Sequence, residues 1–342
     1  MLAAFILIAS FSTYGPIGQD SSFLYVAGAG GIDRVEKSDL SRRVRIVTTQ
    51  RRIAAIDVDG DRVLYATSST PKCEPFYFGN YTFSQCKWID TEPTHELRSI
   101  PASGGMEVVL ASNSPGITEI AHDYDWVYWI EPANGDARDG RLWRRRKEDG
   151  LRQLLAENLN VDPENQHPFV LQDDSIWISS GSQLLRILKD GGIATTIIGL
   201  FSQTPIAADG HLVYFLPSYG GGAPAQIDSR TLTSSVVPYP NDANGVGYIL
   251  GVADGRVVTM TQLRGIDGTN RVWHLVYLCD QTWRKLGAVF LSKYQGVVFE
   301  PLTEPVVAID SNAVYIDYAG VLTSVHSPSI CGSSSRRRTS RQ

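Results

Sequence analysis

A short unit recurs seven times along the 342-residue chain, and this recurrence limits the folds that the chain can adopt. In each unit an apolar run precedes an Asp, and a hydrophobic segment typical of a β-strand follows it, as in PIAADG and HLVYFL. The Asp precedes an aromatic or aliphatic residue by five positions in five units and by four positions in two. These pairs are Asp20/Tyr25, Asp59/Leu64, Asp123/Tyr128, Asp209/Tyr214, Asp310/Tyr315, Asp173/Trp177 and Asp254/Val258.

A second pattern follows the first in several units: two strands joined by a glycine-containing turn. LRSIPASGGMEVVLA, from Leu97, aligns with LLRILKDGGIATTII, from Leu184, and more loosely with LWRRRKEDGLRQLLA, from Leu142. Each unit is therefore four antiparallel strands, A (inner) to D (outer), with tight turns at Asp-Gly and Gly-Gly. Seven units predict an all-β fold, a seven-bladed β-propeller over residues 1–330 as a single domain, with six or eight blades as alternatives.

The first ten residues, MLAAFILIAS, fit three roles: a signal peptide, a membrane anchor or a strand. Residues 4–9 align with the D strand that precedes Pro205, whereas the last unit has no D strand after VLTSVH. We therefore expect residues 4–9 to pair with the last unit and close the ring. A signal peptide fits less well because the first basic residue is Arg34, and the run is too short to span a bilayer. The basic tail, residues 331–342, is predicted to be disordered.

Four cysteines allow three pairings. Cys73 and Cys86 bracket the stretch CEPFYFGNYTFSQC, so we expect a disulfide between them, and Cys279 and Cys331 then pair by default. An even number of cysteines with one such pair favours an extracytoplasmic location: secreted, periplasmic or at the cell surface. The sequon Asn80-Tyr81-Thr82 supports secretion weakly.

One unit carries a family resemblance. The segment VYWIEP, residues 127–132, followed by GRLWRRRKEDG, resembles the YWTD-type propeller repeat of lipoprotein receptors and related bacterial extracellular propellers. The corresponding segments of other units, VLYATS, IWISSG and VYFLPS, are degenerate. The resemblance implies a β-propeller and does not imply a particular ligand.

The repeated Asp is predicted to close the A–B turn by accepting backbone N–H bonds. The residues concerned are Asp20, Asp59, Asp123, Asp209 and Asp310. The alternative, a metal or catalytic carboxylate, would not need to recur in every unit. The stretch from Asp57 to Asp61 resembles the start of a calcium loop, but its sixth position is Arg62 and its twelfth is Ser68. We therefore expect no metal site and no cofactor.

The loops are the better indication of function. B–C and D–A connections share the top face of a propeller, where ligands usually bind. The B–C connections at 67–96, 131–140, 217–225 and 261–270 are long, and those at 179–182 and 318–320 are short. The candidate binding residues on the long ones are Phe76, Tyr77, Tyr81, Trp88, Glu131, Arg138, Tyr219, Arg264 and Asp267. Exposed aromatics and arginines suit recognition of a protein or carbohydrate, and the alternative is that they pack beneath their own loops.

Two functions remain open at this point. The first is a non-enzymatic extracytoplasmic binding propeller, expected to be a monomer, with a protein or glycan ligand. The second is a hydrolase or lyase with a dispersed site at the top of the central channel. No G-x-S-x-G motif, P-loop or dinucleotide fingerprint is present, which favours the first. The net charge of −5 does not favour nucleic acid or membrane insertion.

Overall fold

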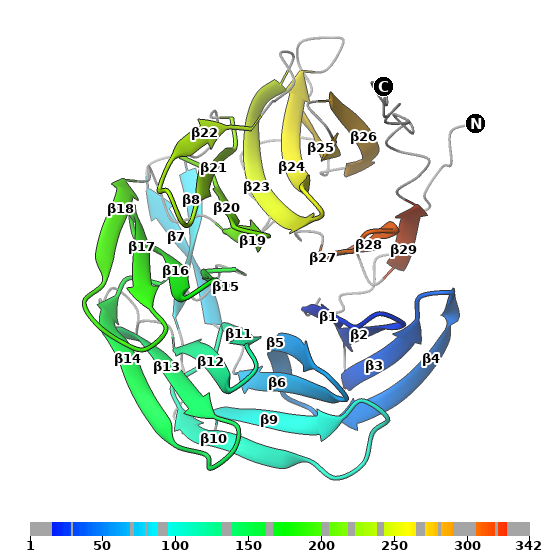
Figure 1. The fold of residues 1–342 in the computed structure, drawn as a ribbon. Coiled ribbons are helices and arrows are strands. Elements are labelled where there is room, and N and C mark those ends of the chain that lie inside the picture. Colours follow the sequence, from blue (N-terminus) through cyan, green and yellow to red (C-terminus); the bar gives the residue numbers. More distant parts are fainter. Residues whose placement is uncertain are drawn as a thin grey trace, which may run out of the picture.

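The protein is described by a computed structural model that covers residues 16–326, with gaps at 29, 69–71, 79–80, 88–94, 132–138, 162–166, 200–204, 218–222, 238–242, 265–270, 280–281, 290–305 and 319–320. Its strands form antiparallel sheets that follow one another around a ring (Figure 1). Each four-stranded sheet of the ring is one blade.

Six blades have four strands each. Blade 1 comprises β1 (Ile17–Gln19), β2 (Phe23–Gly28), β3 (Gly31–Glu36) and β4 (Asp39–Thr48). Blade 2 comprises β5 (Arg52–Asp59), β6 (Arg62–Ser68), β9 (His95–Pro101) and β10 (Val108–Ser114). Blade 3 comprises β11 (Glu119–His122), β12 (Trp126–Glu131), β13 (Gly140–Arg146) and β14 (Arg152–Leu159). Blade 4 comprises β15 (Phe169–Gln172), β16 (Ser175–Ser180), β17 (Gln183–Leu188) and β18 (Thr195–Gly199).

Blade 5 comprises β19 (Ala207–Asp209), β20 (Leu212–Phe215), β21 (Ala225–Asp228) and β22 (Ser234–Val236). Blade 6 comprises β23 (Ala243–Ala253), β24 (Arg256–Arg264), β25 (Arg271–Cys279) and β26 (Thr282–Val289). The last sheet holds β27 (Val306–Ile309), β28 (Ala313–Tyr318) and β29 (Val321–His326). A separate hairpin, β7 (Lys72–Phe78) and β8 (Tyr81–Lys87), is inserted between β6 and β9.

The prediction of seven four-stranded blades is wrong in its count. Six blades are four-stranded, which is the lower of the two alternatives, and the last sheet has three strands among the described residues. The cause is the one that the sequence pattern suggests: no strand follows β29 in the described part of the chain. Residues 4–9, expected to complete this sheet, and the tail 331–342 lie outside the described residues.

The hydrophobic core lies between neighbouring blades, because successive side chains of a strand face opposite sides of its sheet. In β12, Trp129 packs with blade 2 residues such as Leu64, whereas Tyr128 and Ile130 pack with blade 4 residues such as Ile178. The last sheet packs against blade 1 in the same way, through residues that include Tyr315, Ala308, Leu24 and Val35. The first and last sheets are therefore held together by apolar burial, as any other two neighbours are.

The A–B turns close in two ways. In three of them an Asp side chain caps the turn: Asp20 Oδ1 accepts the N–H groups of Ser22 and Phe23, each at 2.7 Å, and Oδ2 accepts the Tyr25 hydroxyl at 2.7 Å. Asp123 and Asp310 accept the equivalent backbone bonds, and Tyr128 donates to Asp123 at 2.9 Å. Four other turns use a residue with positive φ instead, namely Gly60, Gly210, Asp173 and Asp254. The carboxylates of Asp59 and Asp209, whose turns close by positive φ, contact the next blade, as those of the capping Asp123 and Asp310 also do.

Replacing Tyr25 with Phe should lower the free energy of unfolding by about 1 kcal/mol, because the partly buried Asp20 Oδ2 loses the hydroxyl donor of the fully buried Tyr25. Chemical denaturation would measure this loss. Tyr65→Phe in blade 2 removes a tyrosine hydroxyl that is hydrogen-bonded to Glu107 and not to a turn Asp, so it serves as the comparison variant. A loss for Tyr25→Phe that is no larger than the fitting error would contradict the capping role of the Asp–Tyr pair.

Candidate functional site

The bottom face, which carries the A–B and C–D turns, is joined by polar contacts between blades. In five blades the residue directly after the C strand donates its backbone N–H to a carbonyl in the blade's own A–B turn. In four of these the side chain of that residue also contacts the preceding blade's turn Asp. The pairs are Lys37–Asp310 at 2.6 Å, Lys147–Asp59 at 2.6 Å, Lys189–Asp123 at 3.3 Å and Ser229–Asp173 at 2.6 Å. Asp209 Oδ2 accepts a hydrogen bond from the backbone N–H of Gly255 in the next blade. This face is therefore built mainly from contacts that hold blades together.

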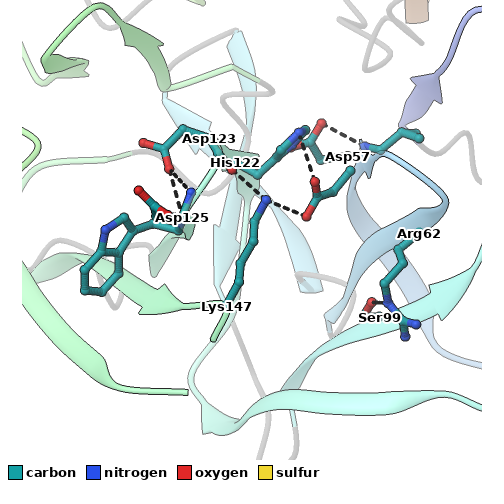
Figure 2. Close-up of polar contacts among 10 residues, drawn as sticks. Asp57, Arg62, Ser99, His122, Asp123, Asp125 and Lys147 are labelled. Atoms are coloured by element: carbon teal, nitrogen blue, oxygen red, sulfur yellow. Dashed lines mark hydrogen bonds and ion pairs between the residues drawn. The ribbon is translucent and has the colours of Figure 1, made fainter. Parts of the chain in front are cut away.

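A denser group of ionisable side chains lies where β5 of blade 2 meets β11 of blade 3 (Figure 2). His122 Nδ1 is 2.6 Å from Asp57 Oδ2, and His122 Nε2 is 3.6 Å from Asp59 Oδ1. Lys147 Nζ is 2.6 Å from Asp59 Oδ2 and donates to the Asp123 carbonyl oxygen at 2.6 Å. All four side chains are about one quarter exposed. Two carboxylates thus face one imidazole and one ammonium group.

The pKa of His122 is raised above its usual value of 6.5. The hydrogen bond to Asp57 is the main cause; burial acts against it, the negative charges of Asp57 and Asp59 add to it, and Lys147 lowers it. Glu119, also on β11, has a raised pKa because it is buried, although His167 Nδ1 lies 3.0 Å from its Oε2 and opposes the shift. The surroundings of the inner strand β11 therefore favour the protonated forms of His122 and Glu119.

This group is already balanced by its own charges. Asp57 is paired with His122 and Asp59 with Lys147, so the stretch that resembles a calcium loop has protein cations as its partners. Among the residues that the structure describes, no three His, Cys, Asp or Glu side chains form a group that could hold a metal ion. His122 is the last residue of β11 and Asp59 the last residue of β5, so both adjoin A–B turns. They therefore lie on the bottom face and not at the top of the central channel.

The candidate binding residues are only partly placed. Phe76 and Tyr77 lie on β7, Tyr81 on β8 and Arg264 at the end of β24, and only the backbone is described there. The residues Trp88, Arg138, Tyr219 and Asp267 lie outside the described residues. The structure therefore brings three of the aromatic candidates into one hairpin and does not place the others relative to it.

Glu131 lies among the described residues, and its side chain is buried and not exposed on a loop. It is the last residue of β12 and is 3% exposed. Arg152 donates to Glu131 Oε1 at 3.1 Å, and the Trp129 indole nitrogen lies 3.4 Å from the same oxygen. The Arg152 guanidinium lies over the ring of Trp143 at 3.9 Å and that of Trp129 at 5.1 Å. Glu131, a candidate binding residue on the 131–140 connection, is therefore buried, and Arg152 and Trp129 supply the partners that make its burial tolerable.

The hairpin of β7 and β8 pairs Cys73 directly with Cys86. It forms a two-stranded sheet of its own, while β6 and β9 on either side pair with each other through Thr67 and Glu96. The hairpin therefore leaves the blade at the B–C connection, on the top face. Cys279 ends β25, and Cys331 lies outside the described residues.

Comparisons with known proteins support the fold. No protein-family model matches the chain, and no curated protein matches it, so the resemblance to YWTD-type repeats remains a prediction. Solved structures that match include a computationally designed protein, Ika8, with TM-score 0.54 and 11% identity, over 92% of this chain and 96% of that one. The β-propeller domain of the Trilobed protease from Pyrococcus furiosus matches with TM-score 0.53 and 11% identity, over 91% of this chain and 90% of that one.

A third match is the extracellular domain of the putative hybrid two-component system BT4673 from B. thetaiotaomicron. Its TM-score is 0.54 and its identity 12%, over 93% of this chain and 38% of that one. At these identities the matches establish a β-propeller and nothing about activity. Among the described residues, no helix is long and apolar enough to cross a membrane.

Proposed function

We propose that the protein is an extracytoplasmic binding propeller whose top-face connections recognise a protein or carbohydrate. The observation that carries this proposal is the β7–β8 hairpin, a separate two-stranded sheet inserted into the B–C connection of blade 2. Its sequence, KCEPFYF and YTFSQCK, contains five aromatic residues in two strands of seven. Aromatic side chains supply large contact areas at low cost in conformational entropy, which suits recognition.

The arrangement of the two faces supports this proposal. The bottom face is occupied by contacts between blades, such as Lys147–Asp59 and Lys189–Asp123, which leave these carboxylates already paired. The B–C connections on the top face are uneven, from the two residues between β16 and β17 to the long insertion between β6 and β9. Variable connections on a regular scaffold are where binding residues are usually found.

Removal of the hairpin tests the proposal. Because Thr67 and Glu96 are register partners, residues 69–94 can be replaced by a short Gly-Ser turn that leaves the β6–β9 pairing intact. We expect the intact chain to be retained by a glycan array or by an immobilised extracellular protein fraction, and the shortened chain to lose at least about 90% of that signal.

The matched control is Tyr124→Ser, which removes an aromatic side chain that is 93% exposed on the opposite face. It should leave binding unchanged. Equal binding by the intact and shortened chains, with both melting cooperatively, would refute the role of the hairpin. Binding that falls equally for Tyr124→Ser would show non-specific adhesion by exposed aromatics.

The predicted Cys73–Cys86 disulfide belongs to the same proposal, because a disulfide forms and persists in an oxidising, extracytoplasmic compartment. Cys73 and Cys86 are opposite each other in the β7–β8 register, as cross-strand disulfides require. Peptide mapping of the unreduced protein, expressed in an oxidising compartment, should yield one fragment that joins the two residues. Recovery of Cys73 as a free thiol would overturn this pairing and weaken the case for an extracytoplasmic location.

A further inference from the structure

His122 stands between two carboxylates that belong to one strand of the neighbouring blade. Its Nδ1 lies 2.6 Å from Asp57 and its Nε2 lies 3.6 Å from Asp59, and both acids are on β5. A neutral imidazole carries one N–H, whereas the imidazolium carries an N–H on each nitrogen. Only the protonated ring can therefore present a donor to both carboxylates at once.

The charge count of the group changes with that proton. With His122 protonated, two cations face two anions, since Lys147 is the other cation and lies 2.6 Å from Asp59. With His122 neutral, Asp59 keeps Lys147 but Asp57 loses its cation, so one negative charge is uncompensated in a site that is only about one quarter exposed. Partly buried charges are screened less than exposed ones, so this imbalance acts across the contact between the two blades.

The remaining ionisable neighbours do not offset the loss. Glu119, on β11 with His122, also acts on Asp57, and its own partner is His167 at 3.0 Å on the side of blade 4. Asp123 follows His122 directly and is paired with Lys189 at 3.3 Å, while its carbonyl oxygen accepts from Lys147. Arg62, the register partner of Asp59, donates to Ser99 Oγ at 2.6 Å, and the described contacts join it to neither Asp57 nor Asp59.

We propose that the contact between β5 of blade 2 and β11 of blade 3 is a proton-dependent switch, closed while His122 is protonated and loosened when it loses its proton. Blade 2 also carries the β7–β8 hairpin, so the switch controls how firmly the hairpin-bearing blade is attached to the next one. This inference does not depend on the identity of any ligand.

The direction of the pH effect follows from the raised pKa of His122. A histidine whose pKa is higher in the folded state contributes stability fully below the unfolded value of 6.5, and this contribution disappears as pH rises through the folded pKa. Blades 2 and 3 should thus be held together most firmly in mildly acidic solution and less firmly in alkaline solution. Asp123 and Asp310, whose pKa values are lowered, respond in a separate and more acidic range.

The test is hydrogen exchange of the intact chain, with protection factors corrected for the intrinsic pH dependence of exchange. Protection of the β5 and β11 amides should fall by roughly threefold or more between about pH 6 and about pH 8.5, and that of β15 and β16 should change less. In His122→Gln, which cannot titrate, the β5 and β11 protection should be the same at both values.

The matched control is His211→Gln. His211 Nε2 lies 3.6 Å from Asp228, and both residues belong to blade 5, so this ion pair does not connect two blades. The His211→Gln variant should keep the pH dependence of β5 and β11 protection. If His122→Gln also keeps that dependence, or if the wild-type protection does not change with pH, the switch does not exist.

A second measurement does not rely on stability. The NMR titration of the His122 ring should show a midpoint above 6.5, and Lys147→Met should move it to a still higher pH, because the Lys147 charge opposes protonation. A midpoint for His122 at or below 6.5, or a downward shift in Lys147→Met, would overturn the proposal.

Discussion

Replacing Arg152 with Ala should destabilise the protein by about 3 kcal/mol, because Glu131 would lose its only described cationic partner. Glu131 is 3% exposed and its Oε1 receives Arg152 at 3.1 Å. The substitution also removes the guanidinium that covers Trp143 at 3.9 Å. Arg152 is 36% exposed, which places the expected loss at the lower end of the range for breaking a buried pair. Urea denaturation would measure it.

Arg146→Ala is the matched control for this prediction. Arg146 lies over the Trp126 ring at 5.1 Å and is paired with Asp149, and both partners of that ion pair are more than one third exposed. Its loss should therefore be much smaller. Adding Glu131→Gln to Arg152→Ala should recover part of the stability, since no buried charge is then left unpaired. Equal losses for Arg152→Ala and Arg146→Ala would show that Glu131 does not need its partner.

Much of the fold could be predicted from the sequence because each blade repeats the same local rules. The Asp and the following Tyr in Asp20/Tyr25 and Asp123/Tyr128 mark a turn that closes by local hydrogen bonds, so a stretch of six residues reveals it. Alternation along the B strands likewise indicates which side chains are buried. The number of complete blades could not be derived in this way. Whether a sheet gains a fourth strand from the far end of the chain is a non-local fact that no single unit encodes.

The candidate site was less accessible to prediction, since its contacts join different units. His122 precedes a turn Asp and belongs to no motif, and its partners Asp57 and Asp59 come from the preceding blade. One signal was present: the residue after the C strand is Lys at 37, 147 and 189, and its recurrence marks a contact between blades. Glu131 was assigned to a loop, although strand alternation places it on the same side as the buried Trp129.

Lys37→Met should weaken the joint between the first and last sheets and lower the free energy of unfolding by about 2 to 3 kcal/mol. Lys37 Nζ lies 2.6 Å from Asp310 Oδ2, and their side chains are 9% and 23% exposed. Met fills a similar volume without the charge, so Asp310 is left without its cation. Arg42→Met, in the same blade but at a side chain that is 69% exposed, should give no measurable change.

The pH dependence of this difference identifies its cause. Burial acts to raise the pKa of Asp310, but the hydrogen bonds from Lys37, Asn312 and Ala313 lower it overall. A carboxylate with a lowered folded pKa stabilises the fold above its unfolded value of 3.8, and this contribution is lost as pH falls through the folded pKa. The stability gap between wild type and Lys37→Met should therefore be complete near neutral pH and shrink in acid below that value. A gap that stays constant across this range would mean that Lys37 acts by packing against Tyr315, whose ring lies 5.2 Å from its Nζ, rather than by its charge.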